Sequence, residues 1–262
     1  MSQPDIFVET SIQVHRILAQ RAVQEKLERQ MASVASRLCS SQYVWMEFQR
    51  TVMADYAYVH ELLRIHHGWW DVMAHLLDGQ RGFRSRSAVR CTQILGHLYN
   101  DSQVDWRYAR QLAEQALRRR LRLLFWTHVT PLPDPIICDL VVAGTVRQPA
   151  GSYTVATSCR KESAACHLPD FLAEHRTELR AIADYLVAHP HAIKDQRRVQ
   201  HLLSAVLEKP RAALGQTSCW PLGDVIIALQ VPAGAALWTL DADFIPLATA
   251  LGLHLYQPEI VT

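Results

Sequence analysis

The order of apolar and polar positions predicts strands that alternate with helices in the first part of the chain. A short apolar run inside Asp5–Glu9 is typical of a buried parallel strand. Ser40 and Ser41 can cap a long helix, because aromatic and aliphatic residues recur at helical spacing from Tyr43 onward. The predicted order is strand, helix, strand, helix over about Asp5–Glu9, Ile12–Ser36, Arg37–Cys39 and Tyr43 to a break at Gly68.

The middle of the chain, from about Trp69 to Thr217, predicts mostly helices and contains no internal repeat. Apolar stripes at helical spacing run through Ala109–Leu124, Leu179–Val187 and Val199–Leu207. The proline-rich stretch Thr130–Pro135 must end a helix. Arginine-rich Gly79–Arg90 predicts a loop, and Pro149–Lys161 has the weakest pattern.

The C-terminal part returns to the alternating pattern. It predicts helix, strand, helix, strand over Val225–Gln230, Ala235–Leu240, Phe244–Leu251 and His254–Tyr256. Short strand–helix–strand units predict an α/β fold with a parallel sheet and right-handed crossovers. In such sheets the ligand crevice lies at the carboxyl ends of the strands. Glu9 and Asp241 both lie at the ends of predicted strands, which points to chemistry at that edge.

Composition narrows the class of protein. The chain has 262 residues, about half of them hydrophobic, and a formal net charge of +2, which permits a nucleic-acid partner without indicating one. We expect a cytoplasmic protein without membrane contact, because no secretory signal opens the chain and the most apolar window, Val225–Leu240, is too short to span a bilayer. The six cysteines are expected as reduced and mostly buried thiols.

Several other kinds of site find little support. The histidines of His60-Glu61 and His66-His67 lack the four-residue spacing of a helical zinc-protease motif. Cys159, Cys166 and His167 lack an evident fourth zinc ligand. The sequence contains neither a glycine-rich phosphate loop nor a G-x-S-x-G serine motif.

Acidic residues at the strand ends and at the starts of neighbouring helices form a set of oxygen donors. Carboxylate oxygens are preferred ligands of Mg²⁺ and Mn²⁺. Unpaired carboxylates that pack together repel one another, so a bound cation between them is a natural solution. Each acid taken alone is more often a helix cap or a solvated surface group.

Four stretches resemble the motifs of the PIN-domain nuclease family. Ile6–Ser11 looks like the first motif, and Ser40–Glu47 is similar to the second, in which a serine precedes a helix that carries a glutamate. Gly223–Leu229 resembles the third motif and Thr239–Phe244 the fourth, followed by an apolar helix that ends at Gly252. The last two motifs are the most specific, because spacing, apolar pattern and glycine all fit. The resemblance covers about the first 60 and the last 45 residues.

The resemblance implies a PIN-like parallel sheet flanked by helices, built from residues 1–60 and 218–262. Residues 61–217 would form a large all-helical insertion. The implied activity is metal-dependent hydrolysis of phosphodiester bonds by endonucleolytic cleavage of single-stranded RNA. The implied setting is a toxin of a toxin–antitoxin module or an RNA-processing enzyme. By this resemblance, Mg²⁺ or Mn²⁺ is the cofactor, and the catalytic and metal-binding residues are Glu9, Glu47, Asp224, Asp241 and Asp243.

One position departs from the family pattern. The first motif normally carries Asp where this chain has Glu9, and the extra methylene moves the carboxylate by about one C–C bond. The alternative is therefore a catalytically weakened PIN-like module that binds RNA or a protein.

Hydroxyl and guanidinium groups near the acids are candidates for substrate contacts. Thr10, Ser11 and Thr239 could hydrogen-bond phosphate oxygens, although helix capping is the alternative for the first two. Arginines on one helix face and in the preceding loop either form a solvated surface or hold the phosphates of RNA, or of DNA, beside the acids. These arginines are Arg107, Arg110, Arg118, Arg119 and Arg122 on the helix, and Arg81, Arg84, Arg86 and Arg90 in the loop. A protein partner bound through the insertion and a homodimer both stay open.

Overall fold

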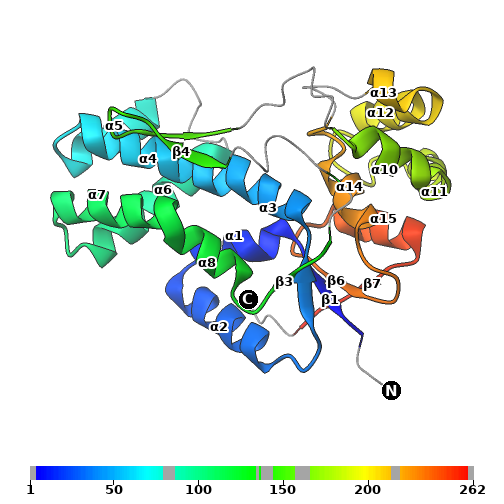
Figure 1. Ribbon diagram of the computed structural model, residues 1–262, viewed down its shortest axis with the longest axis horizontal. Helices are drawn as coiled ribbons and strands as arrows, with labels where there is room; N and C mark the ends of the chain where they lie inside the picture. Colours follow the sequence, from blue (N-terminus) through cyan, green and yellow to red (C-terminus); the bar gives the residue numbers. More distant parts are fainter. Residues whose placement is uncertain are drawn as a thin grey trace.

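A five-stranded sheet, parallel throughout, organises the fold in the order β3-β2-β1-β6-β7 (Figure 1). The computed structural model describes residues 4–78, 86–133, 136, 144–156, 166–213 and 219–258. The strands of this sheet are β1 (Ile6–Val8), β2 (Leu38–Ser40), β3 (Thr130–Pro131), β6 (Ala236–Trp238) and β7 (His254–Leu255). The α/β class that the hydrophobic pattern predicts is confirmed. Each predicted strand is present; β2 is shifted by one residue and the other three are shorter than predicted.

The central strand β1 is buried on both faces. Ile6 pairs with β2 on one side and with β6 on the other. Successive side chains of a strand point to opposite faces. Ile6 and Val8 accordingly lie in one buried cluster with Trp238, whereas Phe7 lies in the larger cluster on the other face. This two-sided burial explains why the strand reads as an uninterrupted apolar run.

The strand order reverses beside β1. The chain adds β2 and β3 on one side of β1, then returns to place β6 and β7 on the other side. Such a reversal opens a crevice at the carboxyl ends of the two central strands. Glu9 follows β1 at that point and Thr239 follows β6.

The first predicted helix is divided into two. α1 (Thr10–Leu18) and α2 (Arg21–Ser33) are separated by Ala19, whose ψ of 171° is extended backbone. Thr10 and Ser11 do not cap α1, because the Glu9 carboxylate itself accepts a hydrogen bond from the Ser11 amide and takes the N-cap position.

The next helix begins as predicted. The Ser41 side chain caps α3 (Gln42–Phe48) by accepting a hydrogen bond from the Val44 amide. A π-helical turn, η1 (Gln49–Met53), joins α3 to α4 (Ala54–Ile65). The chain then breaks near Gly68, as expected, before α5 (Trp69–Asp78).

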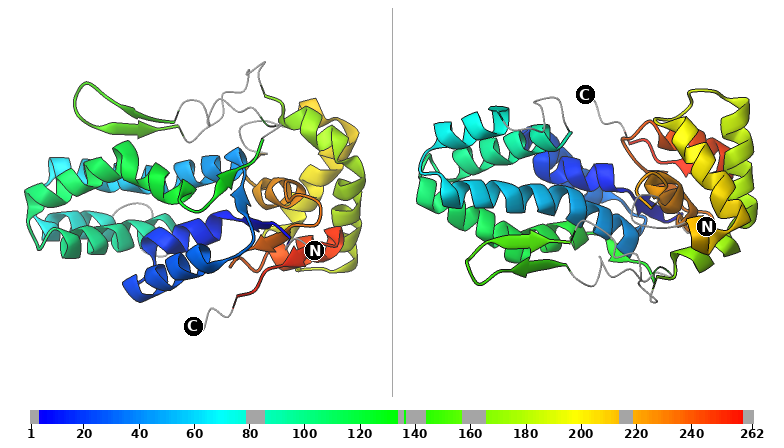
Figure 2. Two further views of the ribbon diagram at one scale, coloured as in Figure 1. Left: turned by 60° about the horizontal axis from the view of Figure 1, so that its bottom comes forward. Right: turned by 90° about the horizontal axis from the view of Figure 1, so that it is seen from above.

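The remaining helices form two groups on opposite sides of the sheet (Figures 1 and 2). The first group continues from α4 and α5 with α6 (Arg86–Asp101), α7 (Trp106–Gln115), the π-helical turn η2 (Ala116–Arg120) and α8 (Leu121–Trp126). The second comprises α10 (Leu168–Glu174), α11 (Arg176–Ala188), α12 (Gln196–Glu208) and α13 (Pro210–Ala213), beside α14 (Gly223–Leu229) and α15 (Phe244–Leu251). α15 ends, as predicted, at Gly252, whose φ of 65° is left-handed.

The segment expected to be an all-helical insertion also contains strands, so that expectation is wrong. β3 joins the edge of the main sheet, and β4 (Thr145–Arg147) pairs with β5 (Tyr153–Val155) in a separate antiparallel hairpin. Pro131 donates no backbone hydrogen bond, which suits an edge strand. The division of the chain into residues 1–60 with 218–262 and an insertion over 61–217 stays a prediction.

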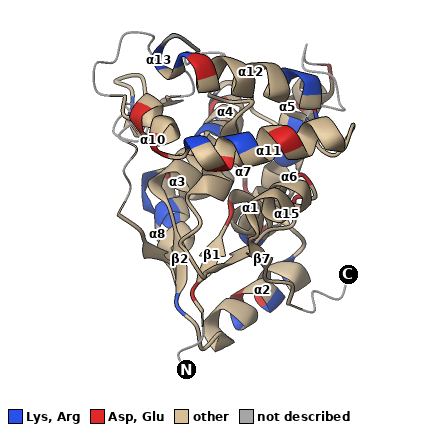
Figure 3. Ribbon diagram, turned by 90° about the vertical axis from the view of Figure 1, so that its right-hand side faces the viewer, with Lys and Arg blue, Asp and Glu red and all other residues tan. Residues whose placement is uncertain are grey.

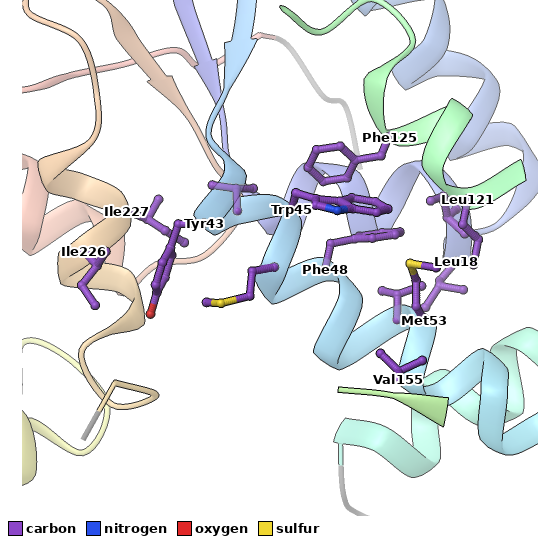
Figure 4. Close-up of a cluster of buried hydrophobic side chains, with 14 of the residues drawn as sticks. Leu18, Tyr43, Trp45, Phe48, Met53, Leu121, Phe125, Val155, Ile226 and Ile227 are labelled. Carbon is purple, nitrogen blue, oxygen red and sulfur yellow. The ribbon is translucent and has the colours of Figure 1, made fainter. Parts of the chain in front are cut away.

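An aromatic cluster packs the first helical group against the sheet (Figure 4). The Trp45 ring lies 5.6 Å from that of Phe48 and 4.9 Å from that of Phe125, measured between centroids. Phe125 belongs to α8 and the other two rings to α3. Such contacts hold α3, which carries Glu47, in a rigid position.

Some expectations fall partly outside the described residues. Residues 79–85 of the predicted arginine-rich loop lie outside them, and Arg86–Arg90 begin α6 instead of ending a loop. Cys138 and Cys159 also lie outside, while Cys39 and Cys91 are buried and Cys166 and Cys219 are half-buried. In the part of the chain that is described, no helix combines the length and apolar character needed to cross a bilayer.

Candidate active site

A cavity of about 1000 Å³ at the carboxyl ends of β1 and β6 brings the predicted acids together. Its lining includes Glu9, Glu47, Asp224, Asp241 and Asp243. They come from four separate stretches of chain: the end of β1, helix α3, the first turn of α14, and the loop between β6 and α15. The expectation that acids from both ends of the chain meet in the folded protein therefore agrees with the geometry.

Glu9 is fixed by hydrogen bonds as β1 ends. Its backbone amide still bonds to the Trp238 carbonyl oxygen, so the sheet sets its position. Its Oε2 accepts from the Ser11 amide at 2.9 Å, the Ser11 hydroxyl at 2.5 Å and the Thr239 hydroxyl at 3.0 Å. Burial raises the pKa of Glu9 to about 7, although the bonds from Ser11 and Thr239 oppose this shift.

Glu47 is held between a hydroxyl and a guanidinium. Its Oε2 accepts from the Thr10 hydroxyl at 3.1 Å, and its Oε1 forms an ion pair with Arg50 Nη2 at 3.0 Å. A Cβ at Gly223 would lie 2.5 Å from Oε1, so only glycine leaves room for this carboxylate. Burial raises the pKa of Glu47, while Arg50 and Thr10 act in the opposite direction.

Asp224 experiences the strongest repulsion. It lies half-buried in the first turn of α14. Burial is the largest cause that raises its pKa to about 8, followed by the charges of Glu47, Glu9, Asp241 and Asp243. These four contributions show that the acids share one electrostatic field.

The loop after β6 orders the last two acids. The Asp241 amide donates to the Thr239 hydroxyl at 3.0 Å, and Asp241 Oδ1 accepts from the Asp243 amide at 3.1 Å. Asp243 Oδ1 in turn accepts from the Lys194 amide at 3.1 Å. This last bond ties the segment before α12 to the acidic loop.

The carboxylates share a cavity, but their present positions do not form a complete set of metal ligands. Within the described ranges, no group of three or more His, Cys, Asp or Glu residues is arranged so that it could hold a metal ion. Glu9 and Glu47 direct oxygens toward hydroxyl and guanidinium partners. The donor chemistry nevertheless suits a divalent cation, since the charges of the other four acids raise the pKa of Asp224 and a cation would remove that repulsion.

The sequence did not single out Arg50, which lies at the centre of the site. Its side chain is 6% exposed, and its guanidinium carbon lies 4.8 Å above the ring centre of Trp220. It belongs to η1, where the Thr51 hydroxyl bonds to the Glu47 carbonyl oxygen at 2.6 Å and competes with the regular helix ladder. π-helical turns are frequent at functional sites. The Glu-x-x-Arg spacing on a helix was the signal that could have revealed this pair.

Cationic side chains reach the cavity from α6, from the segment just before α12 and from the first turn of α12. Arg86, Arg90, Lys194 and Arg198, here called the cationic wall, all line it. Arg90 also pairs with Asp55, which lines the same cavity, at 2.5 Å. Along α11, by comparison, the two signs of charge are mixed (Figure 3).

Arg118 and Arg122, the arginines proposed from sequence, do not line this cavity. Arg118 lies in η2 with a side chain that is 62% exposed, close to Glu114 at 3.7 Å, and Arg122 is exposed in α8. Both side chains face solvent, whereas the neighbouring Leu117 and Leu121 are buried in the core. A helix-face pattern predicts exposure and cannot tell which exposed face borders a site.

The hydroxyls proposed as phosphate contacts hold carboxylates instead. Thr10 donates to Glu47, while Ser11 and Thr239 donate to Glu9. In this arrangement they position the acids.

Comparisons with protein-family models, with curated proteins and with solved structures found no match for this chain.

Proposed function

We propose that this protein is a metal-dependent nuclease that hydrolyses phosphodiester bonds in single-stranded RNA. The observation that carries the proposal is the meeting of five carboxylates from four stretches of chain in one cavity at the strand reversal. The raised pKa of Asp224 agrees with it. A protein rarely gathers unpaired acids unless a cation binds them or a reaction uses them. The resemblance of the four acidic motifs to PIN-domain nucleases agrees with this reading.

Asp224, Asp241 and Glu47 would hold Mg²⁺ or Mn²⁺, with Glu9 and Asp243 beside them. When bound, such an ion lowers the pKa of a water and neutralises charge on the leaving oxygen. The hydrogen bonds from Ser11 and Thr239 all end on Glu9 Oε2, which leaves Oε1 as the oxygen that can take a proton from water. The cationic wall would bind the phosphates of the substrate on both sides of the bond that breaks.

A second candidate function is binding without cleavage. The observation that favours it is the engagement of Glu9 by three hydrogen bonds and of Glu47 by Arg50. A carboxylate so held must release a partner before it can bind a metal. The cavity would then act as an RNA-binding groove whose acids set specificity.

Cleavage of labelled single-stranded RNA with Mn²⁺, and with EDTA in its place, separates the two functions. We expect Mn²⁺-dependent cleavage that falls by at least ~100-fold in Asp224→Asn, because the variant loses a ligand of the ion. Asp184→Asn on the exposed side of α11 is the matched control and should cleave normally. Binding without cleavage by the wild-type protein would favour the second candidate, and equal cleavage by both variants would reject the proposed site.

A further inference from the structure

An aromatic ring lies at the edge of the acidic cluster, where acids alone do not require one. Trp220 lines the cavity and is 52% exposed, although indole rings usually gain stability from burial. Its carbonyl oxygen accepts from the Gly223 amide at 3.1 Å, so the turn that presents the ring is fixed to the start of α14. The ring is held in place and yet open to solvent.

The ring is connected to the acids through one side chain. Arg50 lies over one face of Trp220 and forms its ion pair with Glu47 at 3.0 Å. If a base stacked on Trp220, only the Arg50 guanidinium would lie between the ring and the carboxylates. Such a base would belong to the nucleotide next to the phosphate that lies at the acids.

The cationic wall supplies the other half of a single-strand site. Proteins that bind single-stranded nucleic acid combine a positively charged groove for the backbone with aromatic rings on which bases stack. Arg86 and Lys194 line the same cavity as Trp220 and bring positive charge from two different elements. A duplex keeps its bases stacked on one another and offers none to the ring.

We propose that Trp220 is the base-stacking platform of this cavity and that it selects substrates with an unpaired base beside the phosphate held at the acids. The inference rests on the proposed nucleic-acid function and adds a specificity-determining residue to it. Arg50 is a positioning residue here, since it holds the ring and Glu47 in a fixed relation.

The test measures binding without cleavage. Fluorescence anisotropy in EDTA would follow a labelled oligoadenylate of about eight nucleotides, a length within the usual range of such sites. Trp220→Ala should weaken binding by about fivefold to about 150-fold, the factor that corresponds to stacking of one base, while Trp220→Phe should retain most of the affinity. Trp70→Ala is the matched control, because Trp70 is 86% exposed on α5 and lies outside the cavity lining.

A probe of the same length without bases distinguishes stacking from a structural role of the ring. The affinity of the wild type for this abasic probe should be lower than its affinity for oligoadenylate by about the same factor as Trp220→Ala lowers the affinity for oligoadenylate. Trp220→Ala should bind the abasic probe no more weakly than the wild type does, so the two losses of affinity should not add. Additive losses, equal affinity of wild type for both probes, or Trp220→Phe as weak as Trp220→Ala would overturn the stacking role. Should Trp220→Ala fail to fold, the wild-type comparison of the two probes and Trp220→Phe still decide.

The outcome is independent of the nuclease test. If Mn²⁺-dependent cleavage is present while these binding results fail, the nuclease proposal stands and the stacking platform falls. If stacking is observed without cleavage, the protein is a single-strand binding module with a stacking platform.

Discussion

Glu9 and Asp224 are acids of the same cavity, and burial raises the pKa of both, but the chain surrounds them differently. Donors from Ser11 and Thr239 oppose the effect of burial on Glu9. At Asp224, by contrast, the charges of four other carboxylates add to burial. The donors offset part of the cost of a charge at the end of β1, although burial and the charge of Glu47 still raise the pKa of Glu9. At the start of α14 the neighbouring charges only add to that cost. A bound cation would offset it.

Removing Arg50 should have the largest effect on stability. Arg50→Met leaves Glu47 buried without its ion-pair partner, which costs about 3 kcal/mol for a pair of this kind. Urea denaturation at neutral pH measures the loss. The double variant Arg50→Met with Glu47→Gln removes the unpaired charge of Glu47 and should recover much of the lost stability. A double variant no more stable than the single one would contradict this account.

A methyl group at position 223 should disturb the acids without unfolding the chain. Gly223→Ala places a Cβ 2.5 Å from Glu47 Oε1, so the carboxylate must move. Displacement by about 1 Å can cost ~100-fold in rate, and we expect a loss of that order in Mn²⁺-dependent cleavage. Gly96→Ala in α6, where a Cβ meets nothing within 4 Å, is the control and should cleave normally. Equal rates in the two variants would show that Glu47 does not need its present position.

The raised pKa of Asp224 should appear in the pH dependence of stability. The folded pKa of Asp224, about 8, lies above its usual value of 3.8, so the folded state retains a proton that the unfolded state has lost. The contribution of Asp224 to the free energy of unfolding is therefore greatest below about pH 4, and it is lost as the pH rises toward 8. At pH 8 and in EDTA, Asp224→Asn should melt roughly 2–4 °C above wild type, the shift for about 1 kcal/mol in a chain of this size.

Adding Mn²⁺ at pH 8 should reverse that order of melting temperatures. The ion stabilises the folded wild type in proportion to its binding, and it should do so far less for the Asn variant. Calorimetric melts with and without Mn²⁺ measure both effects. A wild-type melting temperature that does not respond to Mn²⁺ would argue for the binding module.

Loosening Glu9 should give the smallest effect. Thr239→Val removes one of the donors to Glu9 Oε2, which costs about 1 kcal/mol of stability. The pKa of Glu9 should rise, because this bond lowers it, and the acidic limb of the pH–rate profile should move to higher pH. Thr249→Val, whose hydroxyl bonds only along the exposed side of α15, is the control. A profile that does not move would exclude Glu9 as the group that takes the proton.

The sequence by itself determined the central strands of the sheet and the acids that follow them. Phe7 lies between Ile6 and Val8 in a run that is apolar on both faces, and such a run can only be satisfied inside a sheet. Acids at the ends of strands must then gather at one edge. Local patterns alone could therefore propose Glu9 and Asp241 at the strand ends and Asp224 at the start of a helix. Glu47 entered the set only through the resemblance to the PIN-domain motifs.

The tertiary structure decided what surrounds those acids. Three features join residues far apart along the chain: the contact of Arg50 with Trp220, the close approach of Gly223 to Glu47, and the entry of Thr130–Pro131 into the sheet. The same holds for the cationic wall, which comes from α6 and α12 instead of the helix that carries Arg118. Periodicity shows which side of an element is exposed, whereas the neighbour across a cavity depends on how whole elements pack, and no local pattern encodes that.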